Sequence, residues 1–388
     1  MRFSKTAPAP PRIKTVAVFL DWYEPRILKG IARFAKEKHW GLILDNAQVQ
    51  KWAAIPNKVD GLLCLTGPYR ATTQFLLKMN LPTVAMSDAD EGLLGDCSRV
   101  GLDHQACGRM AGEYLRGLGF ENYLTVGKKN RTFFRQRKKV RFFFPIVSAW
   151  ARVIQQVWIG ESLAHVGLRG PIEAALRKAP KPVAIFAPGD VTCLHVMRCA
   201  LELGLRVPED VAILGADNDE MLCTFAPVPL SSIRLNYTQL GFEAAALLDK
   251  IMRGRPPKRP VPLIPPVGVI SRQSTNIMLV PDAQVAKAIH FIWHNIERPF
   301  AIDEITAVVG VSHATLGRLF RQHLERSIVE QIAHMRIDKA KALLTSGKLP
   351  VKEVAEACGF NTASYFNNVF HAATGMTPRK FRLTTPAH

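Results

Sequence analysis

The sequence predicts an α/β protein with two lobes, followed by an all-α domain with a tandem helix-turn-helix. Two observations support this fold class. Short apolar runs alternate with helical patterns along residues 14–275, which is typical of a parallel sheet with crossover helices. Toward the C-terminus, a short helix, a turn with Gly and a helix with a polar outer face then occur in this order twice.

The domain boundaries follow from these changes of pattern. At 388 residues the chain is long enough for two or three domains, each with its own core. We predict a disordered tail over residues 1–13, a two-lobed domain over 14–275, a linker over 276–284 and a helical domain over 285–388.

The two-lobed domain is expected to alternate strands and helices. The strands are predicted at 14–20, 59–65, 82–86 and 122–126 and, farther along, at 183–187 and 211–215. The helices are predicted at 25–38, 71–79 and 104–118, then at 191–203 and 237–252. Because the rhythm starts again in the second group, we expect two lobes.

Polar residues stand where several of these strands end. Ligands of open α/β sheets bind at the carboxyl ends of strands, and a carboxylate accepts charge-assisted hydrogen bonds from sugar hydroxyls. The positions that this rule selects are Asp21, Thr66, Asp88, Asp103, Asp190 and Asp217. Asp190 directly precedes a predicted helix, so a helix N-cap is an equally good interpretation of that residue.

The first helix-turn-helix begins with the amphipathic segment 302–309. Gly310 can supply a left-handed turn, and Ser312 can cap a helix that ends at about Leu324. Leu316, Leu319 and Phe320 are expected in the core because they fall at i, i+3 and i+4. The opposite face, which we expect toward a DNA major groove, carries Ala314, Gly317, Arg318 and Arg321.

The second copy has a first helix at 351–358, a turn at Gly359 and Asn361 or Thr362 as the next N-cap. The residues expected to face inward are Tyr365, Phe366, Val369 and Phe370, and those expected to face outward are Ala363, Ser364, Asn367, Asn368 and His371. Between the copies, 327–344 predicts one long helix that would separate the two recognition helices by roughly one DNA turn. A plain helical bundle with Gly connectors is the alternative.

The tandem pattern resembles the AraC family of bacterial transcription regulators over about residues 283–385. Gly359-Phe360, Tyr365-Phe366 and the closing segment Gly375 to Arg382 carry this resemblance. It implies DNA binding, with contacts expected from His313, Ala314, Thr315, Gly317, Arg318, Arg321, Thr362, Ala363, Ser364, Asn367 and Asn368. Two positions depart from the family: Gly317 has no side chain to contact a base, and Asn368 replaces a frequent Arg, although Asn can hydrogen-bond adenine.

The two-lobed domain resembles the LacI-type periplasmic-binding-protein-like sensors over roughly residues 14–270. The resemblance is carried by Leu205 to Ile213, Gly215 to Glu220 and Pro227 to Ile233, and it implies that Asp217 contacts sugar hydroxyls. The complete set of expected effector contacts is Asp217, Asp190, Asp103, Arg137, Tyr23 and Asp21. Gly189 stands where such sensors commonly have Asn, which removes one contact.

A LacI-type sensor joined to an AraC-type DNA-binding domain is similar to the xylose operon regulators, including the junction from Pro265 to Thr275. This resemblance implies a transcription regulator, expected to be an activator, that binds D-xylose or a related sugar between its lobes. The expected partners are double-stranded promoter DNA, RNA polymerase and a second copy of the chain in a homodimer. The alternative is a degenerate sensor, which would leave a ligand-independent DNA-binding regulator.

Residues 138–170 do not fit the sensor pattern. Lys138 to Pro145 places three consecutive Phe residues beside a run of basic residues. From Val140 to about Arg169 we find neither a helical period nor the expected strand. We therefore expect a diverged or frame-shifted stretch and weakened sugar binding.

Composition disfavours several classes of protein. The sequence contains no run of 18 apolar residues, so a transmembrane helix is not expected. The N-terminus lacks the apolar core of a signal peptide. We therefore expect a cytoplasmic protein without a membrane partner. Seven cysteines without a Cys-x-x-Cys pair predict reduced thiols, no metal site and no cofactor. We find no catalytic motif in the sequence, so we do not expect an enzyme. A sugar-binding carrier with a helical tail is a further alternative, which the duplicated motif disfavours.

Charge is unevenly distributed along the chain. The net charge of +19 fits a nucleic-acid partner. However, residues 283–388 hold only 13 Lys and Arg against eight Asp and Glu, whereas the stretch between Glu121 and Glu161 holds nine basic residues and no acid. The prediction of DNA binding therefore depends on helix faces and spacing rather than on charge.

Overall fold

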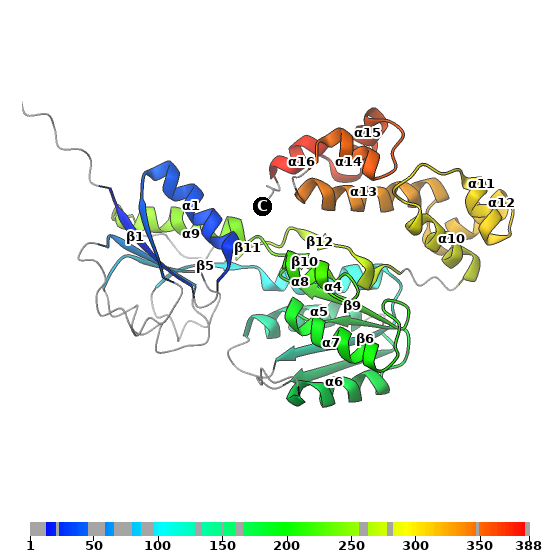
Figure 1. The fold of residues 1–388 in the computed structure, drawn as a ribbon, viewed down its shortest axis with the longest axis horizontal. Helices are drawn as coiled ribbons and strands as arrows, with labels where there is room; N and C mark the ends of the chain where they lie inside the picture. The colour runs from blue at the N-terminus through cyan, green and yellow to red at the C-terminus, as the bar shows by residue number, and fades with distance from the viewer. Residues whose placement is uncertain are drawn as a thin grey trace, which may run out of the picture. The chain divides into compact units, whose positions relative to one another are not determined.

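The computed structural model of the chain describes residues 13–20, 23–45, 59–65, 80–86, 97–128, 134–148, 151–159, 166–255, 263–277, 282–346 and 349–384. These residues divide into two compact units (Figure 1). The first unit contains the described residues up to His104 and those between Asn236 and Pro266, and the second contains most of the remainder. Each unit is built on its own six-stranded sheet, and the helical C-terminal domain belongs to the second unit.

The first sheet is parallel throughout and has the order β11-β5-β4-β3-β1-β2. Its strands are β1 (Thr15–Leu20), β2 (Gly41–Asp45), β3 (Gly61–Leu65), β4 (Thr83–Met86), β5 (Ser98–Leu102) and β11 (Leu263–Ile264). The predictions at 14–20, 59–65 and 82–86 are confirmed to within two residues, whereas β2, β5 and β11 were not predicted. The helix predicted at 71–79 lies outside the described residues.

Helices α1 (Pro25–Lys38) and α9 (Tyr237–Met252) cross each other beside the first sheet (Figure 1). Both were predicted with these bounds. Their backbones touch at two glycines, because a Cβ on Gly30 would overlap the carbonyl oxygen of Thr238 and a Cβ on Gly241 would overlap that of Ile27. The two glycines thus allow a helix crossing that no larger residue permits.

The second sheet has the order β12-β10-β9-β8-β6-β7 and is parallel except for β12. Its strands are β6 (Asn122–Lys128), β7 (Val153–Ile159), β8 (Val183–Phe186), β9 (Val211–Ala216), β10 (Ser231–Arg234) and β12 (Gly268–Ile270). The helices of this part are α4 (His104–Gly117), α5 (Phe134–Ser148), α6 (Val166–Lys178), α7 (Asp190–Glu202) and α8 (Glu220–Phe225). The strands predicted at 122–126, 183–187 and 211–215 and the helices predicted at 104–118 and 191–203 are confirmed.

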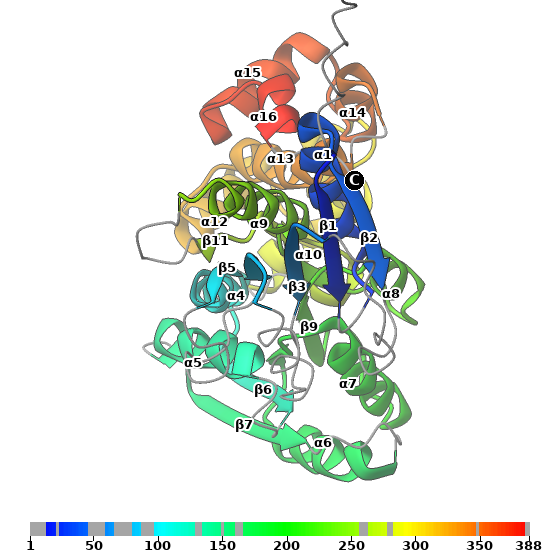
Figure 2. The ribbon, with the colours of Figure 1, turned by 90° about the vertical axis from the view of Figure 1, so that its left-hand side faces the viewer.

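The expectation that residues 140–169 hold neither a helix nor a strand is wrong. They contain most of α5, the whole of β7 and the start of α6. Strand β7 lies at the sheet edge and pairs only with β6 (Figure 2), so its partly exposed residues include Gln155 and Gln156 and lack a continuous apolar run. In α5, Phe143 is fully buried and stacks on Phe186 with ring centroids 5.3 Å apart.

The C-terminal domain consists of seven helices in the described residues from 282 onward: α10 (Ala283–His294), α11 (Ile302–Val309), α12 (His313–Leu324), α13 (Ile328–Ser346), α14 (Val351–Ala357), α15 (Ala363–Thr374) and α16 (Pro378–Thr384). They form two hydrophobic cores. The first contains residues of α10, α11, α12 and the N-terminal half of α13, and the second contains residues of the C-terminal half of α13 with α14 and α15. One long helix therefore runs through both cores, as the prediction at 327–344 required.

Two further observations concern membrane-spanning helices and the cysteines. None of the helices in the described ranges is long and apolar enough to cross a membrane. All seven cysteines are free thiols, and all but Cys97 are buried.

The contact between α1 and α9 predicts the effect of adding one methyl group. Gly30→Ala should lower the local free energy of unfolding of these helices by about 1–3 kcal/mol, since a Cβ there meets backbone that cannot move aside independently. Denaturant-dependent hydrogen exchange of peptides from α1 and α9 measures this energy. The control is Gly117→Ala at the end of α4, where a Cβ meets nothing within 4 Å. Equal exchange in the two variants would contradict the steric argument.

Candidate effector site and nucleic-acid interface

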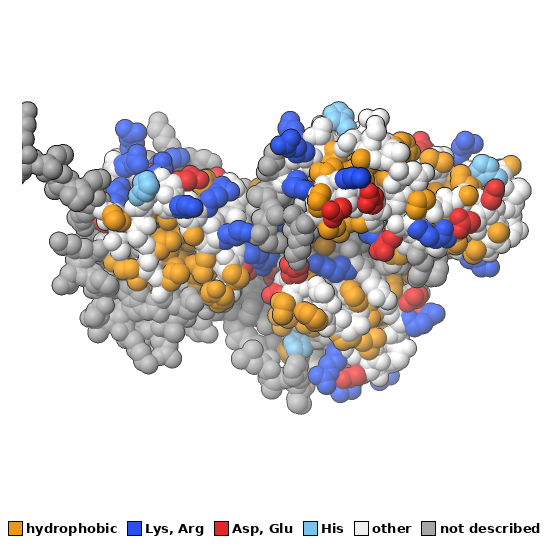
Figure 3. All heavy atoms as spheres, turned by 45° about the horizontal axis from the view of Figure 1, so that its top comes forward, with side chains coloured by type: hydrophobic (Ala, Val, Ile, Leu, Met, Phe, Trp, Pro, Cys, Tyr) orange, Lys and Arg blue, Asp and Glu red, His pale blue; other side chains and the backbone are white. Residues whose placement is uncertain are grey.

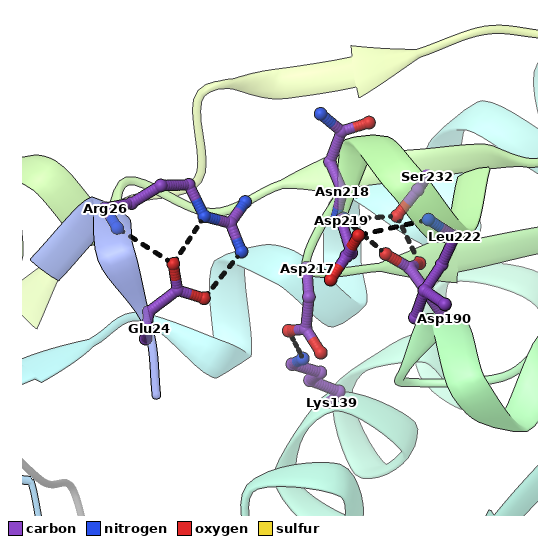
Figure 4. Close-up of polar contacts among 9 residues, drawn as sticks. All are labelled: Glu24, Arg26, Lys139, Asp190, Asp217, Asn218, Asp219, Leu222 and Ser232. Atoms are coloured by element: carbon purple, nitrogen blue, oxygen red, sulfur yellow. Dashed lines mark hydrogen bonds and ion pairs between the residues drawn. The ribbon is translucent and has the colours of Figure 1, made fainter. Parts of the chain in front are cut away.

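Asp190 lies at the carboxyl end of β8 and is the first residue of α7. It is only 2% exposed, and both carboxylate oxygens are used within the protein. Oδ1 accepts a hydrogen bond of 2.6 Å from Ser232 Oγ, and Oδ2 accepts one of 2.8 Å from the backbone N–H of Asp219 (Figure 4). The N-cap of α7 is Gly189, so the interpretation of Asp190 as an N-cap is wrong. Asp190 instead connects α7, β10 and the loop after β9.

Gly215 makes room for this carboxylate. A Cβ at Gly215 would overlap Oδ1 of Asp190 and approach Ser232 Oγ to 3.3 Å. Burial, followed by repulsion from Asp217, raises the pKa of Asp190 to about 7. The sequence run Gly215 to Glu220 was singled out as a ligand segment, but its first residue is required by packing.

Asp217 is held in an unusual backbone conformation at the end of β9. Its φ is 111° and that of Asn218 is 48°, values that L residues rarely adopt. The Asp217 N–H donates to the carbonyl of Ile233 at 3.0 Å, and the Asn218 N–H donates to Ser232 Oγ at 3.0 Å. These bonds direct the Asp217 side chain away from the core, where about a third of it is exposed.

Lys139 of α5 forms an ion pair with Asp217 and was not predicted as a site residue. Its Nζ lies 3.2 Å from Oδ1 of Asp217 and donates to the carbonyl of Pro188 at 3.1 Å, while the side chain is 3% exposed (Figure 4). Burial alone would lower the pKa of Lys139, but the attraction of Asp217, its hydrogen bond and the smaller effects of Cys107 and Asp190 together outweigh burial, and the pKa is raised. The ammonium therefore stays charged. No sequence signal identified Lys139, because it stands in a run of basic residues without a helical period.

The other predicted effector residues are distributed over both units. Asp103 follows β5 in the first unit and is half-buried, and Tyr23 precedes α1 and is 63% exposed. Arg137 lies in α5. Asp21, Thr66, Asp88 and the side chain of Arg137 lie outside the described residues.

Glu24, next to Tyr23, is a buried carboxylate that sequence reasoning missed. It caps α1 through the N–H of Arg26 and accepts two hydrogen bonds, of 2.8 and 2.7 Å, from the guanidinium of the same Arg26 (Figure 4). That guanidinium lies over the ring of Tyr237, with its carbon 4.6 Å from the ring centroid. This arrangement fixes the start of α1 in the first unit.

The segment that leaves the sensor is bonded to the loop of Asp217. Arg272 Nη1 donates to Asn218 Oδ1 at 3.0 Å and to the carbonyl of Leu230 at 2.8 Å. In the short 3-10 helix that follows, Gln273–Thr275, the hydroxyl of Ser274 donates to the carbonyl of Ile213 at 2.6 Å. The chain therefore leaves the second sheet through a set of buried hydrogen bonds that begins next to Asp217.

The first helix-turn-helix has the predicted geometry. Gly310 ends α11 with a φ of 81°, and Ser312 caps α12 by accepting a hydrogen bond from the N–H of Thr315. The predicted core residues Leu316, Leu319 and Phe320 are buried. The predicted DNA-contacting side chains are exposed at His313, Ala314, Arg318 and Arg321 and half-buried at Thr315, and Gly317 is half-buried as well.

The second helix-turn-helix matches the prediction except at Tyr365. Gly359 has a φ of 70°, and Thr362, rather than Asn361, caps α15. Thr362, Ser364, Asn367 and Asn368 are exposed, and Ala363 is half-buried. Tyr365 was expected to face inward but is 49% exposed, because only its ring edge packs against Phe360. The exposed face of α15 therefore includes Tyr365 in addition to the predicted residues.

On the face drawn in Figure 3, Lys and Arg lie among Asp and Glu without forming one continuous basic area. In the described parts of the chain, no group of three His, Cys, Asp or Glu side chains is placed to hold a metal ion.

These features define a class of protein. Residues 113–275 match the model of a periplasmic binding protein-like domain, and residues 305–384 match that of a helix-turn-helix domain. The two-sheet α/β fold and the tandem helix-turn-helix are those expected from the sequence. The chain is a DNA-binding transcription regulator that carries a periplasmic binding protein-like domain.

Known proteins make this class more specific. The chain is 24% identical over 376 residues to the xylose operon regulatory protein of Haemophilus influenzae, which covers 93% of this chain and 95% of that protein. It is 30% identical over 207 residues to the xylose operon regulatory protein of Escherichia coli K12, over 53% of each chain. The solved structure of a xylose-binding transcription activator, XylR, covers 97% of this chain with a TM-score of 0.60 at 21% identity. The chain is thus similar to the xylose operon regulatory proteins along most of its length, and these relatives are transcription regulators.

The raised pKa of Asp190 predicts a dependence of stability on pH. An unfolded Asp has a pKa of about 3.9, so between about pH 4 and 7 the folded form keeps a proton that the unfolded form has lost. Stability then falls as the pH rises through this window and is constant above it. We expect the midpoint of thermal unfolding to decrease from pH 5 to 7.5, and Asp190→Asn to remove this part of the decrease.

Asp210→Asn is the matched control. Hydrogen bonds from Arg206 lower the pKa of Asp210 to about 2, so its contribution to stability is lost only below about pH 4. The slope between pH 5 and 7.5 should therefore remain as in the natural protein. Parallel profiles for the natural protein and Asp190→Asn would show that Asp190 is ionised throughout this range.

Proposed function

We propose that this protein activates transcription by placing α12 and α15 in the major groove of promoter DNA, in response to D-xylose or a closely related sugar. The main support for DNA binding is that α12 and α15 are both capped helices whose outer faces bear the predicted base-contacting residues. The names of the two xylose operon regulatory proteins support the choice of sugar. Because the protein would have to reach promoter DNA, we propose that it acts in the cytoplasm and that RNA polymerase is a partner.

For the effector, we propose that Asp217 is the main contact in the second unit. A carboxylate that is partly exposed and fixed by Lys139 can accept hydrogen bonds from sugar hydroxyls without reorganising. Asp190 is 2% exposed and each of its oxygens already accepts a hydrogen bond within the protein, so it is proposed to act as a positioning residue for the loop. Asp103, Tyr23, Asp21 and Arg137 remain proposed contacts.

The alternative is a ligand-independent regulator, and one observation favours it. Two of the four carboxylates expected to bind the sugar already have partners in the chain: Asp190 bonds to Ser232 and to the backbone of Asp219, and Asp217 pairs with Lys139. A sugar hydroxyl could bind Asp217 only if the carboxylate accepts a hydrogen bond from the hydroxyl while it stays paired with the ammonium of Lys139.

The hydrogen bond from Arg272 to Asn218 is proposed to transmit sugar binding to the DNA-binding domain. A sugar that contacts Asp217 changes the environment of the adjacent Asn218, and Arg272 connects this residue to the segment leading into the C-terminal domain. Such coupling requires that the sugar bind the two states of this segment with different affinity.

A second copy of the chain is proposed to bind at α8. This short helix exposes Met221 by 67% and Phe225 by 76%, which are the two most exposed large apolar side chains in the described ranges. Burial of such side chains against an identical surface would stabilise a homodimer.

Arg318 provides the test of DNA recognition. In vitro selection from random duplex DNA should enrich a defined sequence with the full-length protein. Arg318→Ala should then weaken binding to that sequence by about 1–3 kcal/mol, roughly 5- to 150-fold, and relax discrimination at one base pair, because Arg pairs with guanine through two hydrogen bonds. Fluorescence anisotropy measures both effects.

The control for lost positive charge is Arg177→Ala on α6, which is also exposed. Its affinity for the selected sequence should remain that of the natural protein. If Arg318→Ala weakens binding equally for all sequences, Arg318 contacts phosphate rather than a base. If no sequence is enriched, the proposed DNA recognition is wrong.

Asp217 provides the test of the sensor. Calorimetry with D-xylose and a panel of pentoses and hexoses should give a dissociation constant for at least one sugar. Asp217→Asn should weaken it by about 10- to 100-fold, because charge-assisted hydrogen bonds become neutral ones. Glu220→Gln, an exposed control three residues later, should leave it unchanged. Failure of every sugar to bind would support the ligand-independent alternative.

A further inference from the structure

Arg336 lies at the point of α13 where the two cores of the DNA-binding domain meet. The preceding residue, Met335, is buried in the first core, and the following residue, Ile337, is buried in the second. We propose that Arg336 is a positioning residue that fixes the two helix-turn-helix motifs relative to each other, so that the protein recognises two half-sites at one spacing only. This inference rests on the proposed DNA recognition and adds what sets the spacing.

The side chain of Arg336 contacts residues of both cores. Its Nη2 donates a hydrogen bond of 2.9 Å to the carbonyl of Arg298, in the segment between α10 and α11. Its guanidinium carbon lies 5.2 Å from the ring centroid of Phe300, just before α11, and 5.8 Å from that of Phe360, just after the turn of the second motif. One planar cation thus bridges an aromatic ring from each core.

The turn of the second motif packs directly on the first motif at the same place. A Cβ on Gly359 would lie 2.5 Å from the carbonyl oxygen of Ile296, 2.9 Å from that of Arg298 and 3.0 Å from Nη2 of Arg336. Gly359 is therefore required twice, by its positive φ and by this close approach. The contact joins backbone to backbone, which leaves little freedom for one motif to rotate against the other.

A second bond supports the arrangement from the surface. Lys339, three residues after Arg336, places its Nζ 2.6 Å from Oε1 of Glu297. A helix shared by two cores can still bend and twist between them. The contacts of Arg336, Gly359 and Lys339 with residues 296–298 restrain this bending and twisting. This restraint fixes the separation of α12 and α15. Operator half-sites must then match that separation.

DNA selection with variants of the full-length protein tests the inference. The natural protein should enrich two half-sites at a single spacing. Arg336→Met should enrich the same half-sites, because no cap or exposed residue of α12 and α15 changes, but at several spacings. Its affinity for the natural two-part site should fall about 10-fold. Lys341→Met on the same helix, whose Nζ bonds only to the nearby Asp338, is the control and should retain the single spacing.

Arg336→Lys separates geometry from charge. A Lys keeps the positive charge but cannot donate to the Arg298 carbonyl while stacking between two rings, so several spacings are again expected. Lys339→Met, which removes only the bond to Glu297, should broaden the spacing less. A single spacing in Arg336→Met, or several spacings in the natural protein, would overturn the inference.

Hydrogen exchange in the absence of DNA gives an independent result. In Arg336→Met, peptides covering residues 295–301 and 358–362 should exchange faster, while the first turns of α12 and α15 should be unchanged. Unchanged exchange at 295–301 overturns the inference even if no DNA sequence is ever enriched. Faster exchange throughout α10 to α16 also overturns it, because Arg336 would then serve folding in general. If no sequence is enriched but residues 295–301 exchange faster, the contact stands and only the proposed DNA recognition fails.

Discussion

The buried carboxylate of Asp190 is the constraint on which the sensor site depends. It holds the N–H of Asp219 and the hydroxyl of Ser232, and Ser232 in turn holds the N–H of Asn218. These bonds keep the loop after β9 in its left-handed conformation and present Asp217 to Lys139. An acidic group buried in this way costs free energy, which its two hydrogen bonds offset. The loop that presents Asp217 is therefore built on a buried carboxylate whose two oxygens each accept a hydrogen bond from the protein.

Close backbone approaches at glycine recur at each functional position. Gly215 leaves room for Asp190, Gly30 and Gly241 let α1 and α9 touch, and Gly359 lets the second helix-turn-helix meet the first. In each case a Cβ would strike a group that is itself fixed by hydrogen bonds or by a helix. The backbone contacts at Gly30, Gly241 and Gly359 restrain neighbouring elements more strongly than side-chain packing does, because backbone has no alternative rotamer.

A basic side chain connects separate elements in each part of the chain, the buried Lys139 in the second sheet's unit and the half-buried Arg336 in the helical domain. Lys139 neutralises Asp217, and its contact with the carbonyl of Pro188 ties α5 to the loop after β8. Arg336 joins the two helix-turn-helix motifs through a carbonyl and two rings. Most of the net positive charge of the chain has no such role, and basic and acidic groups are mixed on the face of Figure 3.

Local patterns in the sequence determined the fold class, most element bounds and the capped recognition helices, because strand and helix periods, glycine turns and Ser or Thr caps act within a few residues. They failed at β7, whose edge position permits Gln155 and Gln156, and at Tyr365, which lies at the margin of its core. Only the tertiary structure paired Lys139 with Asp217, 78 residues away, occupied both oxygens of Asp190 and brought Arg336 onto residue 298. Such pairings depend on which elements pack together, and no local period encodes that.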